Sequence, residues 1–164
     1  MTEDDIIAHI ASHCAEVQIE IDRGNHFFFA PGEKKFPFVT LVISDQYDKA
    51  SDLNRPGVYR LNIGIEKETY HSHFGRAPGW AAPDGVVDTG HDFTALDQLM
   101  PHPVYAPMNW ICALSPSGAT FETLKPLLAE AYEIAVKRSR SDPRRPAPCL
   151  PPGTAEPPAR RTVP

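Results

Sequence analysis

Residues 58–65 constrain the fold most strongly, because apolar and polar side chains alternate there from Tyr59 onward. Successive side chains of a β-strand point to opposite faces of the sheet, whereas a helix would spread this pattern around its circumference. One face of the predicted strand carries Tyr59, Leu61, Ile63 and Ile65, and the other carries Arg60, Asn62 and Gly64. The strand therefore belongs to a sheet with one face on a core and a partly polar face opposite.

Four further segments have strand-like patterns. In residues 17–21 apolar and polar side chains alternate, residues 26–30 are rich in phenylalanine, and residues 38–44 are almost wholly apolar. These patterns predict a half-buried strand, a second strand and a central strand, joined by short polar turns into an antiparallel meander. A fifth strand is predicted at residues 109–114.

Helical patterns lie at both ends of this region. Thr2 and Asp5 form a capping-box pattern, and Ile6, Ile7, Ile10 and Cys14 then share one side at helical spacing. The last helix carries a buried stripe of Leu124, Leu127, Leu128, Ala131 and Ala135 and runs to about residue 138. Proline is tolerated only near the start of a helix, so its presence at position 126 predicts a regular helix from about residue 123.

The intervening region contains two shorter predicted helices and a long loop. Residues 66–74 form one helix, which Gly75 ends. A second begins after Thr94 and carries Leu96, Leu99 and Met100. Residues 76–91 have no period, and we expect this long loop to be functional or mobile.

The order of elements predicts an α+β fold. Each terminal helix has one apolar stripe, and a single mainly antiparallel sheet of about five strands offers one face on which both can pack. The other face, carrying Arg60, Asn62 and Thr40, or the long loop at its edge, is where we expect a ligand.

The composition changes at residue 139. Eight of the 18 prolines fall in residues 139–164, whose only bulky apolar side chains are Leu150 and Val163. Such a segment buries too little surface to offset its ordering entropy. The prediction is one domain over residues 1–138, followed by a disordered Pro/Arg-rich tail. The tail contains five arginines and two acidic residues, so its net charge is +3. Because the whole chain has a net charge of −5, the domain carries about −8.

Composition also narrows the classes of partner and location. The acidic domain disfavours bulk attraction to nucleic acid or anionic lipid. The apolar runs are far shorter than the ~20 residues of a membrane helix, so no membrane partner is expected. The acidic start has no leader pattern, and three scattered cysteines are not a disulfide framework, so a cytoplasmic protein is expected. No phosphate-loop or dinucleotide pattern occurs, and no cofactor is predicted.

Several short runs carry a resemblance to a known family. They are residues 35–42 (KFPFVTLV), 47–48, 51–53, 55–64 (RPGVYRLNIG), 94–97 (TALD) and 99–105 (LMPHPVY). Together they resemble an uncharacterised bacterial family of domains of unknown function. The resemblance covers most of residues 1–138 and implies membership without implying an activity.

A second, fold-level resemblance rests on residues 103–110 and 131–133. Their patterns, Pro-x-Tyr-x-x-Met-x-Trp and Ala-Tyr-Glu, are similar to those of the MmcQ/YjbR proteins. The resemblance implies a CyaY-like sheet covered by helices, and DNA binding. This chain departs from those proteins in its acidic domain and in having no lysine or arginine between Pro101 and Leu114.

The first candidate site combines Asp97, His102 and Tyr105 with Asn109 and Trp110. A histidine beside a carboxylate can act as a general acid or base near neutral pH, so the first three are candidate catalytic residues. The alternative interpretation is structural: His102 bonds to the backbone or to Asp97 and holds the turn between two prolines.

Two other groups of polar residues are candidate sites. Arg60 and Asn62 project from one strand face and could contact an anionic ligand, or they could belong to a solvated face with cross-strand pairs. His9 and His13 are four residues apart on a helix, a spacing that can bind a metal. Their position at the margin of the apolar stripe favours ordinary boundary residues, so no metal site is predicted.

The sequence is compatible with three functions. The preferred hypothesis is a non-catalytic binding or interaction module for a small molecule or a protein. The second is a hydrolytic or acid–base enzyme using Asp97, His102 and Tyr105. The third is a nucleic-acid-binding module, which rests on the MmcQ/YjbR resemblance and is disfavoured by the acidic domain.

Overall fold

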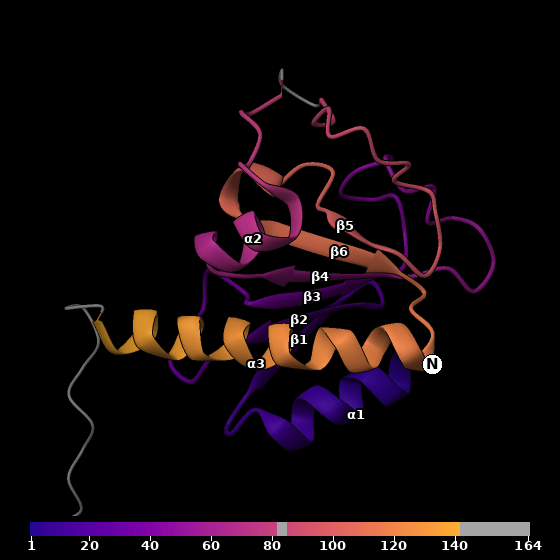
Figure 1. The fold of residues 1–164 in the computed structure, drawn as a ribbon. Helices are drawn as coiled ribbons and strands as arrows, with labels where there is room; N and C mark the ends of the chain where they lie inside the picture. Colours follow the sequence, from indigo (N-terminus) through magenta and orange to yellow (C-terminus); the bar gives the residue numbers. More distant parts are fainter. Residues whose placement is uncertain (82–84, 142–164) are drawn as a thin grey trace, which may run out of the picture.

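The computed structural model describes residues 1–81 and 85–141 and shows helices packed on one antiparallel sheet (Figure 1). The helices are α1 (Glu3–His13), α2 (Lys67–Phe74), the 3-10 turn η1 (Ala106–Met108) and α3 (Gly118–Ser141). The strands are β1 (Gln18–Asp22), β2 (Asn25–Phe29), β3 (Val39–Val42), β4 (Arg60–Gly64), β5 (Leu99–Pro101) and β6 (Trp110–Leu114). Their spatial order is β1-β2-β3-β4-β6-β5. Most of the predicted disordered tail, residues 142–164, lies outside the described residues.

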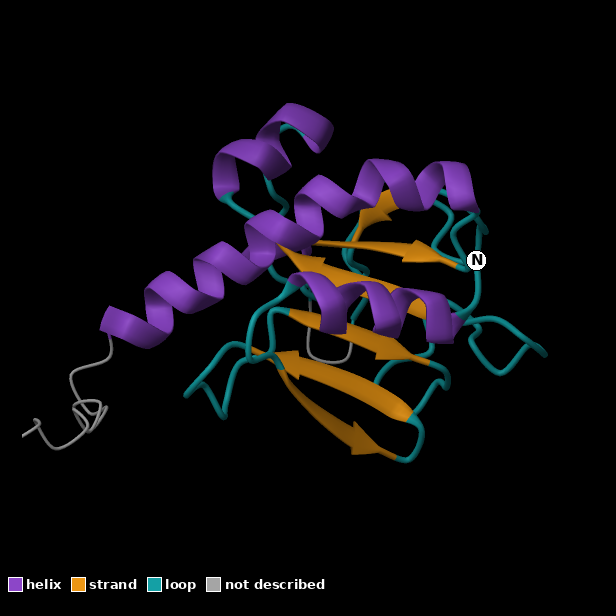
Figure 2. Ribbon diagram, turned by 90° about the horizontal axis from the view of Figure 1, so that it is seen from below, coloured by secondary structure: helices purple, strands orange, loops and turns teal. Residues whose placement is uncertain are grey.

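The predicted α+β class, with one antiparallel sheet and both terminal helices on the same face, is confirmed. Helices α1 and α3 lie side by side across one face of the sheet in both views (Figures 1 and 2). The strict alternation of β4 explains this arrangement, because Leu61 and Ile63 point into the core beneath the helices. The helices contribute buried side chains such as Ile6, Ile10 and Leu124 to the same core. We call the opposite side of the sheet the open face.

The sheet has six strands, because Leu99–Pro101 forms β5 at the edge beyond β6. The prediction of a short helix carrying Leu99 and Met100 is therefore wrong. Leu99 pairs with Ala113 and Met100 with Cys112, so pairing with a distant strand outweighs the local helical spacing. Pro101 is compatible with β5 because this strand lies at the sheet edge.

At the other edge, β1 is fully exposed rather than half-buried as predicted. Ile21 has 66% of its surface accessible and Ile19 has 37%. The apolar and polar alternation correctly indicates a strand. It does not indicate burial, because the two helices cover the central strands and leave this edge open.

Helix α3 starts at Gly118, earlier than the predicted start near residue 123. The Ser117 hydroxyl accepts a hydrogen bond from the Thr120 N–H and caps the first turn. Pro126 therefore lies inside the helix, on its exposed side, where water can satisfy the carbonyl that a proline cannot bond.

Helix α3 also continues through Ser141, beyond the predicted domain end at residue 138. The buried Ser139 hydroxyl donates to the Pro31 carbonyl at 2.7 Å, and the Arg138 guanidinium donates to the Phe36 carbonyl at 3.0 Å. The last turns of α3 are thus fixed to the loop between β2 and β3. In residues 1–81 and 85–141, every helix is too short or too polar to span a bilayer.

Replacing Pro126 with alanine tests the position of α3. Alanine restores the N–H for the helical hydrogen bond and removes the steric conflict of an internal proline. We expect the variant to gain about 1–3 kcal/mol in free energy of unfolding, as measured by urea denaturation. Glu133→Ala, an exposed change on the same helix, should stay within about 0.5 kcal/mol of the unchanged protein. A loss of stability in Pro126→Ala would contradict a continuous helix through this position.

Candidate functional site

A cavity of about 430 Å³ lies on the open face of the sheet. Its floor consists of the polar residues Thr40, Asp48, Arg60, Asn62 and His102. Its walls are mainly apolar and include Phe27, Phe36, Val42, Tyr47, Tyr105, Met108 and Trp110. Alternation in β3 and β4 positions the floor, since the neighbours of Thr40, Arg60 and Asn62 point into the core on the other side.

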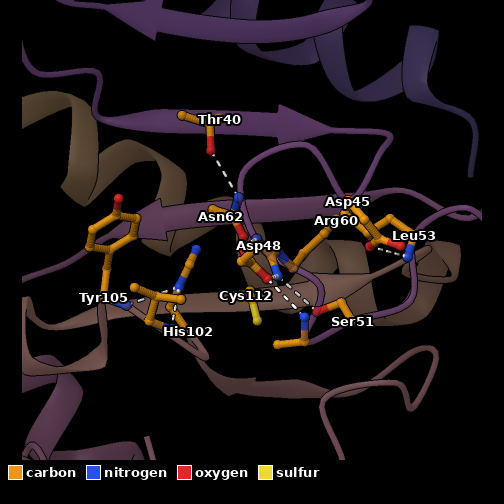
Figure 3. A network of polar contacts seen from close by, with 12 residues as sticks. Thr40, Asp45, Asp48, Ser51, Leu53, Arg60, Asn62, His102, Tyr105 and Cys112 are labelled. Carbon is orange, nitrogen blue, oxygen red and sulfur yellow. Dashed lines mark hydrogen bonds and ion pairs between the residues drawn. The ribbon is translucent and has the colours of Figure 1, made fainter. Parts of the chain in front are cut away.

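Arg60 forms a buried ion pair with Asp48. The guanidinium donates to both carboxylate oxygens, at 3.0 and 2.6 Å, and to the Ser51 hydroxyl at 2.8 Å (Figure 3). Burial acts to raise the pKa of Asp48, but hydrogen bonds from Arg60 and its positive charge outweigh burial and lower it. The sequence alone makes Arg60 a candidate for binding an anion. The structure instead gives its charge an internal partner.

Asn62 occupies the next position on the same face of β4. Its amide nitrogen donates to the Thr40 hydroxyl across the strand pair at 2.9 Å. Its carbonyl oxygen Oδ1 is buried and has no hydrogen-bond partner within the described part of the chain. The Nε of Arg60 is likewise buried and unpartnered there. Buried polar atoms are nearly always paired in folded proteins, so these two are unusual.

His102 lines the cavity although only 2% of its surface is accessible. Its Nδ1 accepts hydrogen bonds from the backbone N–H groups of Val104 and Tyr105, both at 3.0 Å. The proton of the neutral ring therefore lies on Nε2. Burial, aided by the nearby Arg60 charge, holds the pKa of His102 well below its ordinary value, so the ring is neutral at pH 7.

The structure separates the members of the first candidate site. His102, Tyr105 and Trp110 all line the cavity, but Asp97 and Asn109 do not. The Asp97 carboxylate accepts a hydrogen bond from Ser117 N–H at 2.6 Å, at the start of α3. Asn109 has φ of 60° and ends η1. His102 is therefore held by backbone donors, as the structural interpretation expected, and not by Asp97.

Trp110 forms a wall of the cavity because Gly64 stands opposite it in the sheet. A Cβ atom at position 64 would lie 3.0–3.2 Å from three atoms of the indole ring. The missing side chain therefore lets the ring lie against the backbone of β4. A glycine inside an alternating strand is the sequence signal that indicates such a close approach.

Sequence reasoning missed Asp48 and most of the aromatic walls. Asp48 and Tyr47 lie in the loop between β3 and β4, and Phe36 lies in the loop between β2 and β3. These loops have no periodic pattern from which an orientation could be predicted. Phe27 lies in a predicted strand whose run of three aromatic residues gives no alternation from which the face of each ring could be predicted.

His13 is exposed, whereas His9 is half-buried with its ring 5.3 Å from that of Phe121 in α3, and the two imidazoles stack at a centroid distance of 4.0 Å. His13 also contacts the His9 carbonyl oxygen at 2.8 Å. Burial raises the pKa of the neighbouring Cys14 thiol to about 11. Among residues 1–81 and 85–141, no group of three or more histidine, cysteine or acidic side chains is arranged to bind a metal ion.

Replacing Asp48 with asparagine should destabilise the protein, because Arg60 would stay buried without a countercharge. We expect a loss of about 3–5 kcal/mol at pH 7, measured by urea unfolding. Asp48 has a lowered pKa in the folded state, so the ion pair contributes above the unfolded-state pKa of about 3.9 and is lost on further acidification. The difference between the two proteins should therefore shrink below about pH 4.

Asp52→Asn is the matched control for this experiment. Its carboxylate is 61% exposed and lies 3.7 Å from Arg55 in a surface ion pair. Such pairs contribute about 0–1 kcal/mol. Equal effects of the two substitutions, or a pH-independent effect at position 48, would contradict the structural role assigned to the buried pair.

Comparison with protein-family models identifies a family for this chain. A family model described as "Family of unknown function (DUF6194)" matches residues 1–144. Neither the curated proteins nor the solved structures include a match to the chain. The MmcQ/YjbR resemblance therefore stays a prediction. The family match includes α1 through α3 and every residue that lines the cavity. It confirms the predicted membership in a family of domains of unknown function: this chain belongs to DUF6194.

Proposed function

We propose that the domain is a non-catalytic binding module that takes a small, uncharged and largely apolar molecule into the cavity on the open face. The cavity itself carries this proposal. Its volume of about 430 Å³ falls within the range of small-molecule sites. Aromatic walls above a few buried polar groups are the usual composition of such sites, because the apolar walls contribute affinity and the polar groups orient the ligand.

The pairing of cations around the cavity supports an uncharged ligand. Arg60 is bound by both oxygens of Asp48, and Arg138 lies 3.6 Å from the Glu33 carboxylate. Arg138 also stacks on the Phe36 ring at 5.4 Å. A carboxylate or phosphate ligand would have to compete with these internal partners. The same pairing gives little support to binding of a nucleic-acid backbone.

The state of His102 supports binding over acid–base catalysis. A general base needs an unprotonated ring nitrogen directed at the substrate. The proton of His102 lies on Nε2, and its Nδ1 is occupied by two backbone donors. His102 is therefore suited to donate a hydrogen bond. Asp97, which could have assisted a base, is bonded to the start of α3.

We also propose a cytoplasmic location. Cys14 and Cys112 are both buried as free thiols. Burial raises the pKa of Cys112 to about 12, so this thiol stays protonated. Cysteines used as small apolar core residues are typical of proteins from reducing compartments.

Titration with N-phenyl-1-naphthylamine, an uncharged probe whose fluorescence increases in apolar sites, tests the proposed function. Trp110 lines the cavity, and the exposed Trp80 is the other tryptophan of the chain. In Trp80→Phe, Trp110 is the sole tryptophan and reports on the cavity directly. We expect saturable probe binding with one site per chain and energy transfer from Trp110 to the probe.

Val42→Phe and Ile21→Phe provide a matched pair for this titration. Val42 lines the cavity, so a larger side chain there should weaken probe binding at least about tenfold. Ile21 is exposed on β1, away from the cavity, and its replacement should leave binding unchanged. Binding that is absent, or that is equal in both variants, would contradict a ligand site in this cavity.

A further inference from the structure

We propose that the cavity floor recognises the amide edge of a flat lactam, with Asn62 Oδ1 accepting a hydrogen bond from the ligand N–H and His102 Nε2–H donating to the ligand carbonyl. This inference rests on the proposed function and specifies the chemical class of its ligand. It follows from the hydrogen-bonding groups that the protein leaves unused at the cavity floor.

The acceptor is the free end of the Asn62 amide. In the structure the amide nitrogen donates to the Thr40 hydroxyl, which leaves Oδ1 as the end without a partner among the described residues. The Oδ1 atom is buried, and the described residues offer it no donor. Asn62 is only 2% exposed. A ligand N–H directed at Oδ1 would satisfy an acceptor that is otherwise costly to bury.

The donor is fixed by the environment of His102. The backbone N–H groups of Val104 and Tyr105 hold Nδ1 as an acceptor, which leaves the hydrogen on Nε2. The described residues provide no hydrogen bond to Nε2, which in Figure 3 points away from this backbone. Asn62 and His102 line the same cavity. The free Asn62 acceptor and the His102 donor in one cavity match a group that carries one N–H and one carbonyl.

The remaining surroundings favour a flat and uncharged molecule. The Asp48 carboxylate neutralises the charge of Arg60 next to Asn62. The buried Nε–H of Arg60 is a second donor without a partner among the described residues. The Tyr105 and Trp110 rings lie beside His102, with centroid distances of 5.0 and 6.4 Å to the imidazole. Aromatic rings contribute most to binding when they pack against a flat apolar body.

Three related probes test this inference in the full chain: quinolin-2(1H)-one, its N-methyl derivative and quinoline. The N-methyl derivative keeps the carbonyl but lacks the N–H, and quinoline lacks both the N–H and the carbonyl. Dissociation constants are measured by calorimetry. We expect quinolin-2(1H)-one to bind at least about tenfold more tightly than either relative, because only it pairs both Oδ1 and Nε2.

Two variants assign the preference to Asn62. Asn62→Leu removes the acceptor, and the ratio between quinolin-2(1H)-one and its N-methyl derivative should fall to within about twofold. Val42→Ala shortens one apolar side chain of the cavity wall without changing the polar floor, so the ratio should persist. If Asn62→Leu does not fold, NMR spectra of the unchanged protein still test the inference. The ¹⁵N resonances of the Asn62 amide and the His102 ring should shift with quinolin-2(1H)-one and much less with its N-methyl derivative.

The outcomes separate the two proposals. If N-phenyl-1-naphthylamine does not bind, the proposed function fails. If it binds but none of the three probes does, only the lactam inference is overturned. If the three probes bind equally well, the domain is still a binding module, but the lactam inference is overturned. It is also overturned if the preference survives in a folded Asn62→Leu protein, or if the two resonances do not respond.

Discussion

The burial of one charged side chain in the middle of the sheet determines much of this structure. Arg60 lies on the central strand β4 with 2% of its surface exposed, and a buried guanidinium needs a carboxylate beside it. Asp48 supplies that carboxylate from the loop between β3 and β4. The loop must therefore fold back over the open face, where Tyr47 becomes part of a cavity wall. The site is thus a consequence of charge compensation as well as of strand alternation.

The sequence predicted features that depend on local periodicity. The alternation in β4 correctly assigned Leu61 to the core and Arg60 to the opposite face, because a period of two residues is set by the strand itself. Features that depend on distant partners were not predictable in this way. β5 exists because Leu99 pairs with Ala113, and the exposure of Ile21 depends on how far the helices extend across the sheet.

In the candidate site, too, local periodicity predicted some residues, whereas contacts with distant residues were not predictable. The predicted open face carries the cavity, with Arg60, Asn62, His102, Tyr105 and Trp110 in its lining. Nearness in the sequence misled the assignment of Asp97, whose backbone has φ of 58° and whose carboxylate bonds to Ser117. The partner of Arg60 could not be predicted, because the loop between β3 and β4 contains several acidic residues and the sequence does not show which of them reaches the guanidinium. The sequence also could not show which ring nitrogen of His102 is the donor, because this depends on the backbone N–H groups of the turn that follows it.

The attachment of α3 to the loop between β2 and β3 has a consequence for the cavity. Arg138 and Ser139 hold the backbone of this loop at Phe36 and Pro31, and Phe36 lies at the cavity edge. Helix ends open more readily than helix centres. Fraying of the last turn of α3 would free the backbone of this loop at Phe36 and Pro31 while the sheet stays intact. The shape of the cavity near Phe36 therefore depends on the stability of a helix end that lies outside the sheet.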